Sequence, residues 1–288
     1  MLCSDVPARQ AEGDRAPSVA SSNRGRPEEE AVEAGRRPAR RLPADPYTDA
    51  SGREGDRLSR AGARRGGVPT RDRGTVIFAD RTDAGEQLAK ALVDHVGTDS
   101  VVLAIPRGGV IVGEVVARAI GAPLDVVVPR KIGAPGNPEL GIGAVAPGVR
   151  VLDRRLLQTL RVTPEYLERE IAAQEREIER RESAYRRGRP PVDVKGKVAI
   201  VVDDGIATGS TAAAALRWAR ARGASKVILA VPVAPVPSLR RLADEADEIV
   251  VLATPEPFLA VGEWYRHFDQ TSDDEVVAAL DRVNGEQG

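Results

Sequence analysis

The sequence predicts an α/β fold built on a doubly wound, mainly parallel sheet, and three observations support this class. Short apolar runs without polar alternation, as in strands buried on both faces, occur at 100–106, 123–129, 198–202 and 225–231. Segments with helical patterns alternate with these runs, which is the order that builds a parallel sheet. One run, 198–202, is followed by two acids and a loop of small residues, and open α/β sheets bind ligands at the carboxyl ends of their strands.

Composition limits the kind of protein this can be. The chain has 288 residues and a net charge of -1, and it is 42% hydrophobic but only 3% aromatic. It can therefore bury a sizeable core, and no overall field draws it to nucleic acid or to a membrane. No apolar run approaches about 18 residues and the first residues lack a signal-peptide core, so we expect a soluble cytoplasmic protein. The single cysteine, Cys3, excludes an internal disulfide and a cysteine-based zinc site.

Residues 1–73 differ from the rest of the chain. They are rich in Arg, Gly, Pro, Ser and acids and poor in large apolar residues, so they cannot bury enough surface to offset their ordering entropy. We predict a disordered N-terminal arm at 1–73 and one folded domain at 74–288. Because no aromatic residues interleave with its basic pairs, an inert arm or a start site assigned too far upstream is favoured over a nucleic-acid-binding arm.

The first elements predicted in the domain are a short strand at 76–78 and a helix that runs through Val96. Asp83 and Glu86 have the three-residue spacing of a capping box, which would begin this helix.

Arg107-Gly108-Gly109 joins the strand at 100–106 to a helix predicted at 110–120. A glycine pair after an apolar strand lets backbone amides face a ligand, and Arg107 adds a permanent cation. The alternative interpretation is a plain tight turn.

Arg130 and Lys131 follow the strand at 123–129 and begin a long loop, 132–145, with Gly and Pro throughout. Long irregular loops in compact domains are often lids or binding loops, so these cations are candidates for a site. The alternative is a basic surface turn.

A strand at 149–152, paired with 142–145, precedes a predicted helical insertion at about 154–190. Thr163 as a cap and Pro164 at the first helical position begin its long helix. Its apolar stripe is thin and its Glu and Arg residues support one another, so we expect a solvated helix lying on the domain. In the alternative, three of its basic residues point toward a phosphate site: Arg186, Arg187 and Arg189.

The stretch that follows, KVAIVVDDGIATGST, predicts a phosphate site. Asp203 and Asp204 end a buried strand, and small residues then lead into a helix, whose first N–H groups are unpaired and whose dipole favours an anion. Carboxylates repel a bare phosphate, but a ligand with hydroxyls or a bound cation beside its phosphate avoids that repulsion. The pattern therefore indicates a sugar phosphate with magnesium, against the alternative of a solvated acidic turn.

Helices at 210–222 and 238–246 and strands at 225–231 and 248–252 complete the predicted alternation. The tail at 255–270 holds most of the large aromatic residues.

VVDDGIATGST resembles the phosphoribosyl-pyrophosphate (PRPP) signature of type I phosphoribosyltransferases. The resemblance implies that fold, with Asp203 and Asp204 on the ribose hydroxyls. It also places the substrate's 5′-phosphate in the loop made by Gly205, Ile206, Ala207, Thr208, Gly209, Ser210 and Thr211. Together with the PRGG and PRKIGAPGNPELGIGAV blocks and the inserted helix, it points to a subgroup of phosphoribosyltransferases predicted from sequence.

The same resemblance implies roles for other residues. In the family a short loop at the position of Arg107, Gly108 and Gly109 grips pyrophosphate. A mobile loop that begins at the position of Arg130 and Lys131 closes over it, so these two cations would neutralise the leaving group. An aromatic residue such as Phe258 stacks on the base in purine-using members; core packing is the equal alternative here.

The predicted reaction is therefore transfer of ribose 5-phosphate from PRPP to a nitrogen nucleophile, a nucleobase, with release of pyrophosphate. Family chemistry implies Mg²⁺ bound mainly through PRPP, no metal site made by the protein alone, and no nucleic-acid or membrane partner, and it allows a homodimer. The alternative is a non-catalytic regulatory protein that senses PRPP or a nucleotide. No lysine follows Gly209, which excludes a P-loop nucleotidase, and no G-x-S-x-G motif supports a serine hydrolase.

One departure bears on the acceptor. Members that use 6-oxopurines carry an acid in the loop after the two aspartates, and this loop has none. Ala207 resembles the adenine-type and orotate-type loops instead, so hypoxanthine and guanine are disfavoured and the proton-transfer residue is left unassigned.

Overall fold

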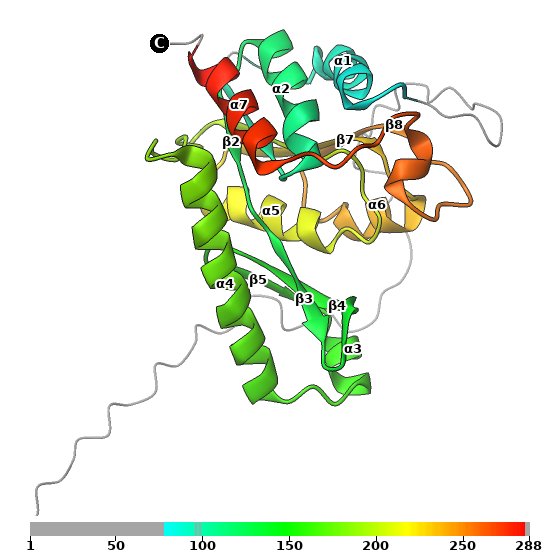
Figure 1. Ribbon diagram of the computed structural model, residues 1–288. Helices are drawn as coiled ribbons and strands as arrows, with labels where there is room; N and C mark the ends of the chain where they lie inside the picture. The colour runs from blue at the N-terminus through cyan, green and yellow to red at the C-terminus, as the bar shows by residue number, and fades with distance from the viewer. Residues whose placement is uncertain (1–77, 96, 98, 286–288) are drawn as a thin grey trace, which may run out of the picture. The chain divides into compact units, whose positions relative to one another are not determined.

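A parallel sheet of five strands lies at the centre of the chain (Figure 1), in the order β2-β1-β6-β7-β8. The computed structural model describes residues 78–95, 97 and 99–285. The strands are β1 (Ser100–Ala104), β2 (Leu124–Val126), β6 (Val198–Val202), β7 (Lys226–Val233) and β8 (Glu248–Ala253). All their pairings are parallel, which confirms the predicted fold class. The predicted arm at 1–73 lies outside the described residues, as do two residues of the strand predicted at 76–78.

Helices cover both faces of this sheet, as a doubly wound fold requires (Figure 1). One face carries α1 (Arg81–Leu92), α2 (Gly108–Ile120) and α7 (Asp273–Gly285), and the other carries α5 (Ser210–Ala221) and α6 (Val236–Leu242). Successive strand residues feed opposite cores, so Val102 packs with the first group and Val101 with the second. This explains why the strands read as continuous apolar runs.

The start of α1 differs from the prediction. Asp80, not Asp83, is its N-cap, and the Asp80 carboxylate accepts hydrogen bonds from the backbone N–H groups of Thr82 and Asp83. Asp83 lies in the first turn and accepts from the N–H of Ala79 at 2.8 Å. The spacing of Asp83 and Glu86 indicated a helix start correctly to within one turn but named the wrong cap, because aspartates at 80 and 83 offer the same signal.

The segment predicted as a long irregular loop, 132–145, is instead part of a second sheet. Antiparallel strands β3 (Arg130–Ala134), β4 (Asn137–Ala146) and β5 (Val149–Leu152) form it in that order. The loop prediction was therefore wrong, whereas the pairing of 149–152 with 142–145 is confirmed. The glycines that suggested a loop lie at close contacts: a Cβ added to Gly133 would lie 2.8 Å from the Pro138 backbone.

Helix α4 (Pro164–Arg186) begins as predicted, with Thr163 as N-cap and Pro164 in its first turn, and a short helix, α3 (Arg154–Thr159), precedes it. Its apolar stripe is not merely laid on the surface, because Ile171, Ile178 and Tyr185 are fully buried in the main core.

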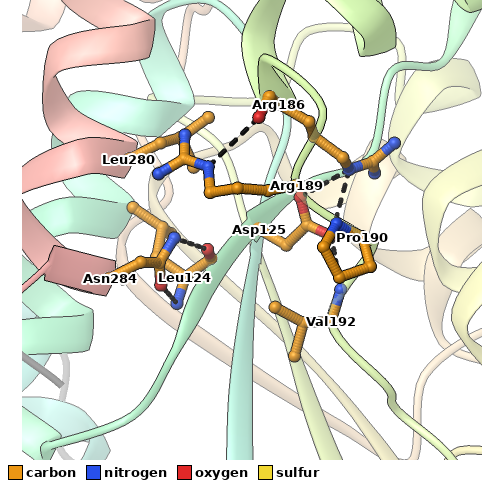
Figure 2. Close-up of a pocket in the computed structure, with 8 residues that line it drawn as sticks. All are labelled: Leu124, Asp125, Arg186, Arg189, Pro190, Val192, Leu280 and Asn284. Carbon is orange, nitrogen blue, oxygen red and sulfur yellow. Dashed lines mark hydrogen bonds and ion pairs between the residues drawn. The ribbon is translucent and has the colours of Figure 1, made fainter. Parts of the chain in front are cut away.

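The alternative that Arg186, Arg187 and Arg189 face the phosphate site is wrong. Figure 2 shows Arg186 turned toward Asp125 of β2, with its Nε 2.9 Å from a carboxylate oxygen. Arg189 and Arg187 lie near Asp281 of α7, at 2.8 and 3.9 Å. These arginines therefore belong to the edge of the main sheet, where a pocket of about 240 Å³ opens beside Arg186 and Asn284.

The C-terminal part adds a helix that was not predicted. After η1 (Val261–Trp264), Ser272 and Glu275 make a reciprocal capping box that begins α7. Helix α6 starts two residues before the predicted 238 and ends earlier than the predicted 246. All described residues lie in one compact unit. None of the helices in this part of the chain is both long and apolar enough to cross a membrane.

Candidate functional site

The candidate site lies where the connections of the main sheet diverge. Strands β1 and β6 are neighbours, with Ala104 opposite Val202 at their carboxyl ends. After β1 the chain passes through α2 to β2, and after β6 it passes through α5 to β7 on the other side. Such a topological switch point is where open α/β sheets bind ligands, so the two loops that follow β1 and β6 are the ones to examine.

These two loops hold the predicted glycine pair and acid pair, and they pack directly together. A Cβ added to Gly108 would overlap the Asp204 carboxylate, and one added to Gly109 would lie 2.9 Å from the Asp203 Cα. No larger residue fits at either position without moving the acids. Glycine is therefore required here for close approach of the two loops, beyond any role in a turn.

The loop after the acids presents the start of α5. Gly209 has φ 86° and is the N-cap of α5, which has no side-chain cap. The Ser238 hydroxyl donates to the Ala207 carbonyl at 2.5 Å, and Arg241 donates to the Thr208 carbonyl at 3.2 Å. With these carbonyls held from α6, the helix end that carries Ser210 and Thr211 offers its first N–H groups to an anion.

Arg81 is a site residue that the sequence analysis missed. Its Nε donates to Asp204 Oδ2 at 2.8 Å, its Nη1 donates to the Asp269 carbonyl at 2.7 Å, and its guanidinium lies 3.9 Å from the centroid of the Phe268 ring. The acids thus have a basic partner from α1, although no basic residue occurs in their own loop. No local signal could have found this pair, since 123 positions separate the two residues.

The two acids differ in their electrostatics. Burial and the neighbouring Asp204 charge raise the pKa of Asp203 well above its ordinary value. Burial also raises the pKa of Asp204, but the Arg81 guanidinium opposes that rise. Arg81 therefore favours the charged form of Asp204, and Asp203 is the member of the pair that more readily keeps a proton.

The aromatic tail packs on the acid loop. The Tyr265 hydroxyl donates to the Asp204 carbonyl at 2.5 Å, and burial together with the Asp204 charge raises the pKa of Tyr265 above its ordinary value. Val261 touches Gly205, where an added Cβ would lie 2.5 Å from its Cγ1. Phe258 is half-buried and stacks on Trp264, with ring centroids 6.3 Å apart. The predicted stacking of Phe258 on a base stays a prediction.

The predicted cations lie at different distances from the acids along the chain of contacts. Arg107 is the N-cap of α2, beside Gly108, and its Nη1 is 3.9 Å from Asp273 of α7. Arg130 donates to Gln174 at 3.0 Å, and Lys131 donates to the Glu139 carbonyl at 3.0 Å. Among the described residues, neither Arg130 nor Lys131 forms a hydrogen bond or ion pair with residues 203–211.

A resident metal centre finds little support in the side chains near the acids. Across residues 78–95, 97 and 99–285, no three His, Cys, Asp or Glu side chains gather as a metal-binding group. Asp203 and Asp204 supply hard oxygen donors of the kind Mg²⁺ prefers, but Arg81 already engages one Asp204 oxygen.

Comparisons with known proteins agree with this geometry. A family model for the phosphoribosyl transferase domain matches residues 78–252. The Mycobacterium tuberculosis (strain H37Rv) protein Rv0571c, whose name assigns it provisionally to the phosphoribosyl transferases, is 50% identical over 209 residues, or 72% of this chain and 47% of that protein. This chain thus spans less than half the length of that relative.

A solved structure gives a closer match in length. The crystal structure of the protein TT1426 from Thermus thermophilus is 44% identical, has a TM-score of 0.61, and covers 71% of this chain and 97% of its own. The chain therefore belongs to the phosphoribosyl transferase domain family, as a member of the type I phosphoribosyltransferases.

Proposed function

We propose that this protein transfers ribose 5-phosphate from PRPP to a nitrogen nucleophile, a nucleobase, and releases pyrophosphate. One observation carries the proposal: Gly108 and Gly109 pack against Asp203 and Asp204 at the switch point, beside the uncapped start of α5. Exposed backbone amides, two carboxylates and a helix N-terminus in one place suit a ligand that has a diphosphate, hydroxyls and a phosphate.

In the proposed reaction the bond between the ribose C1 and the pyrophosphate oxygen breaks, and the acceptor nitrogen bonds to C1 as its proton is released. Asp203 and Asp204 accept hydrogen bonds from the ribose hydroxyls, and residues 207–211 hold the 5′-phosphate. Arg107 and the amides of Gly108 and Gly109 bind the departing pyrophosphate. The protein acts by positioning the reactants and by stabilising the charge that develops on the leaving group.

Mg²⁺ fits this site as part of the substrate complex. Its preferred oxygen donors are the diphosphate and one of the two carboxylates, since Arg81 engages the other Asp204 oxygen. The ion would partly neutralise the diphosphate beside Asp203 and Asp204.

A nucleobase acceptor is supported by the aromatic tail. Phe258 and Trp264 stack on each other next to Val261, which contacts Gly205 of the acid loop. Flat apolar rings at this position suit stacking on a base. The loop at 205–208 contains no acid, so we place adenine and pyrimidines ahead of hypoxanthine and guanine.

A second candidate function is PRPP sensing without catalysis. It is favoured by one observation, that Arg130 and Lys131 bond to Gln174 and Glu139 instead of the residues around Asp203 and Asp204. A sensor needs the binding acids but no cations that close on the leaving group.

The test combines binding with turnover. The full chain is titrated with PRPP and Mg²⁺ by calorimetry, and each nucleobase is then screened with PRPP while pyrophosphate release is followed. A transferase binds PRPP and releases pyrophosphate with one acceptor, and the control D203N/D204N variant does neither. PRPP binding without release for any base establishes the sensor, whereas a parent protein that does not bind PRPP contradicts both functions.

A further inference from the structure

One face of α4 carries a run of polar side chains that reach other elements. Gln174, Glu177, Arg181 and Tyr185 follow one another at spacings of three and four, so they share this face. Glu177 accepts from Arg181 at 2.7 Å, and Gln174 accepts from Arg130 of β3 at 3.0 Å. The inserted helix is thus bonded to the strand that begins with the predicted cations.

Asp273 connects this face to the glycine loop. It accepts a hydrogen bond from the Tyr185 hydroxyl at 2.8 Å and lies 3.9 Å from Arg107. It is also close enough to Arg181 for the two charges to interact. Since the residue after Arg107 is packed on the Asp204 carboxylate, the α4 face borders the candidate site on the side of the glycine loop.

Positive charge is in excess along this border. The cations are Arg107, Arg130, Arg180 and Arg181, and the carboxylates between them are Glu177 and Asp273. Hydrogen bonds from Arg180 and Arg181 lower the pKa of Glu177 to about 2, so Glu177 stays charged and no further anion is gained by titration.

Arg130 bears the cost of this crowding. Burial lowers its pKa, and the charge of Arg181 lowers it further. Two guanidinium groups that repel each other at a partly buried position are a poor way to stabilise a fold, and such groups gather where a ligand supplies the missing charge. A guanidinium is also well matched in shape to phosphate oxygens.

We propose that Arg181 of the inserted helix binds the diphosphate of PRPP and the pyrophosphate product, together with Arg130 and Arg107. This inference rests on the proposed function and adds a residue and an element to its site. The amides of Gly108 and Gly109 hold the phosphate nearest the ribose, and Arg181 and Arg130 receive the outer one. Glu177 keeps Arg181 in place until the diphosphate arrives, and the inserted helix forms one wall of the substrate site.

The test measures binding of inorganic pyrophosphate with Mg²⁺ to the full chain by calorimetry, and its inhibition of PRPP binding. We expect R181Q to weaken pyrophosphate binding by about ten- to a hundredfold, as for loss of a charged hydrogen bond. The matched control is R180Q, because Arg180 bonds to the same Glu177 but its side chain is 59% exposed, against 23% for Arg181. R180Q should change binding by less than about fivefold.

E177Q separates this role from a purely structural one. It removes a negative charge beside Arg181, so pyrophosphate should bind more tightly if Arg181 contacts it. A helix held only by its ion pairs predicts the opposite, since E177Q breaks the pairs to both Arg180 and Arg181. Unchanged pyrophosphate binding in R181Q, or weaker binding in E177Q, overturns the proposal.

The outcomes also separate this inference from the function on which it rests. If D204N loses PRPP while R181Q binds pyrophosphate like the parent, the inference fails and the proposed function stands. If R181Q weakens pyrophosphate binding but D204N binds PRPP normally, the anion site stands and the proposed ribose contacts fail. A parent protein that binds neither PRPP nor pyrophosphate overturns both.

Discussion

Two Arg–Asp pairs in this protein look alike in distance but differ in their surroundings. At the edge of the main sheet, Arg186 Nε lies 2.9 Å from Asp125, and in the candidate site Arg81 Nε lies 2.8 Å from Asp204. The Asp125 carboxylate also accepts from the backbone N–H groups of Val126 and Val192, and Arg186 also donates to the Val126 carbonyl. Within the part of the chain that the structure describes, Asp204 has no comparable set of donors, and a second carboxylate is its sequence neighbour.

The difference separates a structural pair from a functional one. The Asp125 carboxylate is engaged by three donors within the fold, so it has little left to offer a ligand. Asp204 and Asp203 are crowded and only partly satisfied, which costs stability unless a ligand completes the arrangement. Distance alone would have ranked the two pairs equally.

The largest expected effect is on stability at the sheet edge. D125A should lower the free energy of unfolding by about 3–5 kcal/mol, because it leaves Arg186 buried without its partner. Urea unfolding gives this value, and PRPP affinity of the folded fraction should match the parent. R186K, which keeps the charge but loses the fork, should cost less. A D125A variant as stable as the parent would contradict the structural assignment of this pair.

The next effect is on ligand binding at the switch point. D204N should weaken PRPP binding by about ten- to a hundredfold, the equivalent of about 1.5–3 kcal/mol for a hydrogen bond to a charged group. Its unfolding free energy should change much less than that of D125A, since Asn still offers an oxygen to Arg81 and the repulsion of Asp203 is relieved. Calorimetric titration with Mg²⁺ and PRPP, paired with urea unfolding, measures both quantities. A variant that unfolds instead would place Asp204 in the same class as Asp125.

The smallest effect concerns pH. The raised pKa of Asp203 means that the folded state holds a proton that the unfolded chain releases near about pH 4. The free energy of unfolding of the parent should therefore fall as pH rises above that value, until Asp203 ionises in the folded state. D203N lacks this term, so the ligand-free variant should melt higher than the parent at neutral pH, with a difference that shrinks toward pH 4.

Melting curves of the parent and D203N across this pH range provide the check. The Asp125 pair serves as the control, because D125A should remain less stable than the parent across the whole range. Equal pH dependence in the parent and D203N would show that Asp203 ionises without cost.

Much of the fold could be predicted because its signals are local. Continuous apolar runs correctly indicated strands at β1, β6, β7 and β8, and Thr163-Pro164 correctly indicated the start of α4. The prediction failed where composition misleads. Glycine and proline at 133–143 read as a loop, although the glycines make room for the close contacts of β3, β4 and β5. Helix α7 was missed even though Ser272 and Glu275 carry a capping-box signal.

By itself, the sequence determined the chemistry that each loop carries. Asp203, Asp204 and the small residues after them lie within one strand–loop–helix unit, and that unit's polar groups and helix start depend only on neighbours along the chain. The same holds for Arg107-Gly108-Gly109 after β1. Local order was therefore enough to propose a sugar-phosphate site and its loops.

Only the tertiary structure decided which groups those loops meet. Arg81 reaches Asp204 across 123 positions, Tyr265 reaches the Asp204 carbonyl across 61, and Arg107 meets Asp273 of a helix that was not predicted. Such partners are set by how strands order in the sheet and by which helix faces pack together, and neither leaves a pattern in the residues next to the site. The unequal charge states of Asp203 and Asp204 follow from those distant contacts, since burial and a guanidinium from α1 act on two residues that the sequence presents as equivalent.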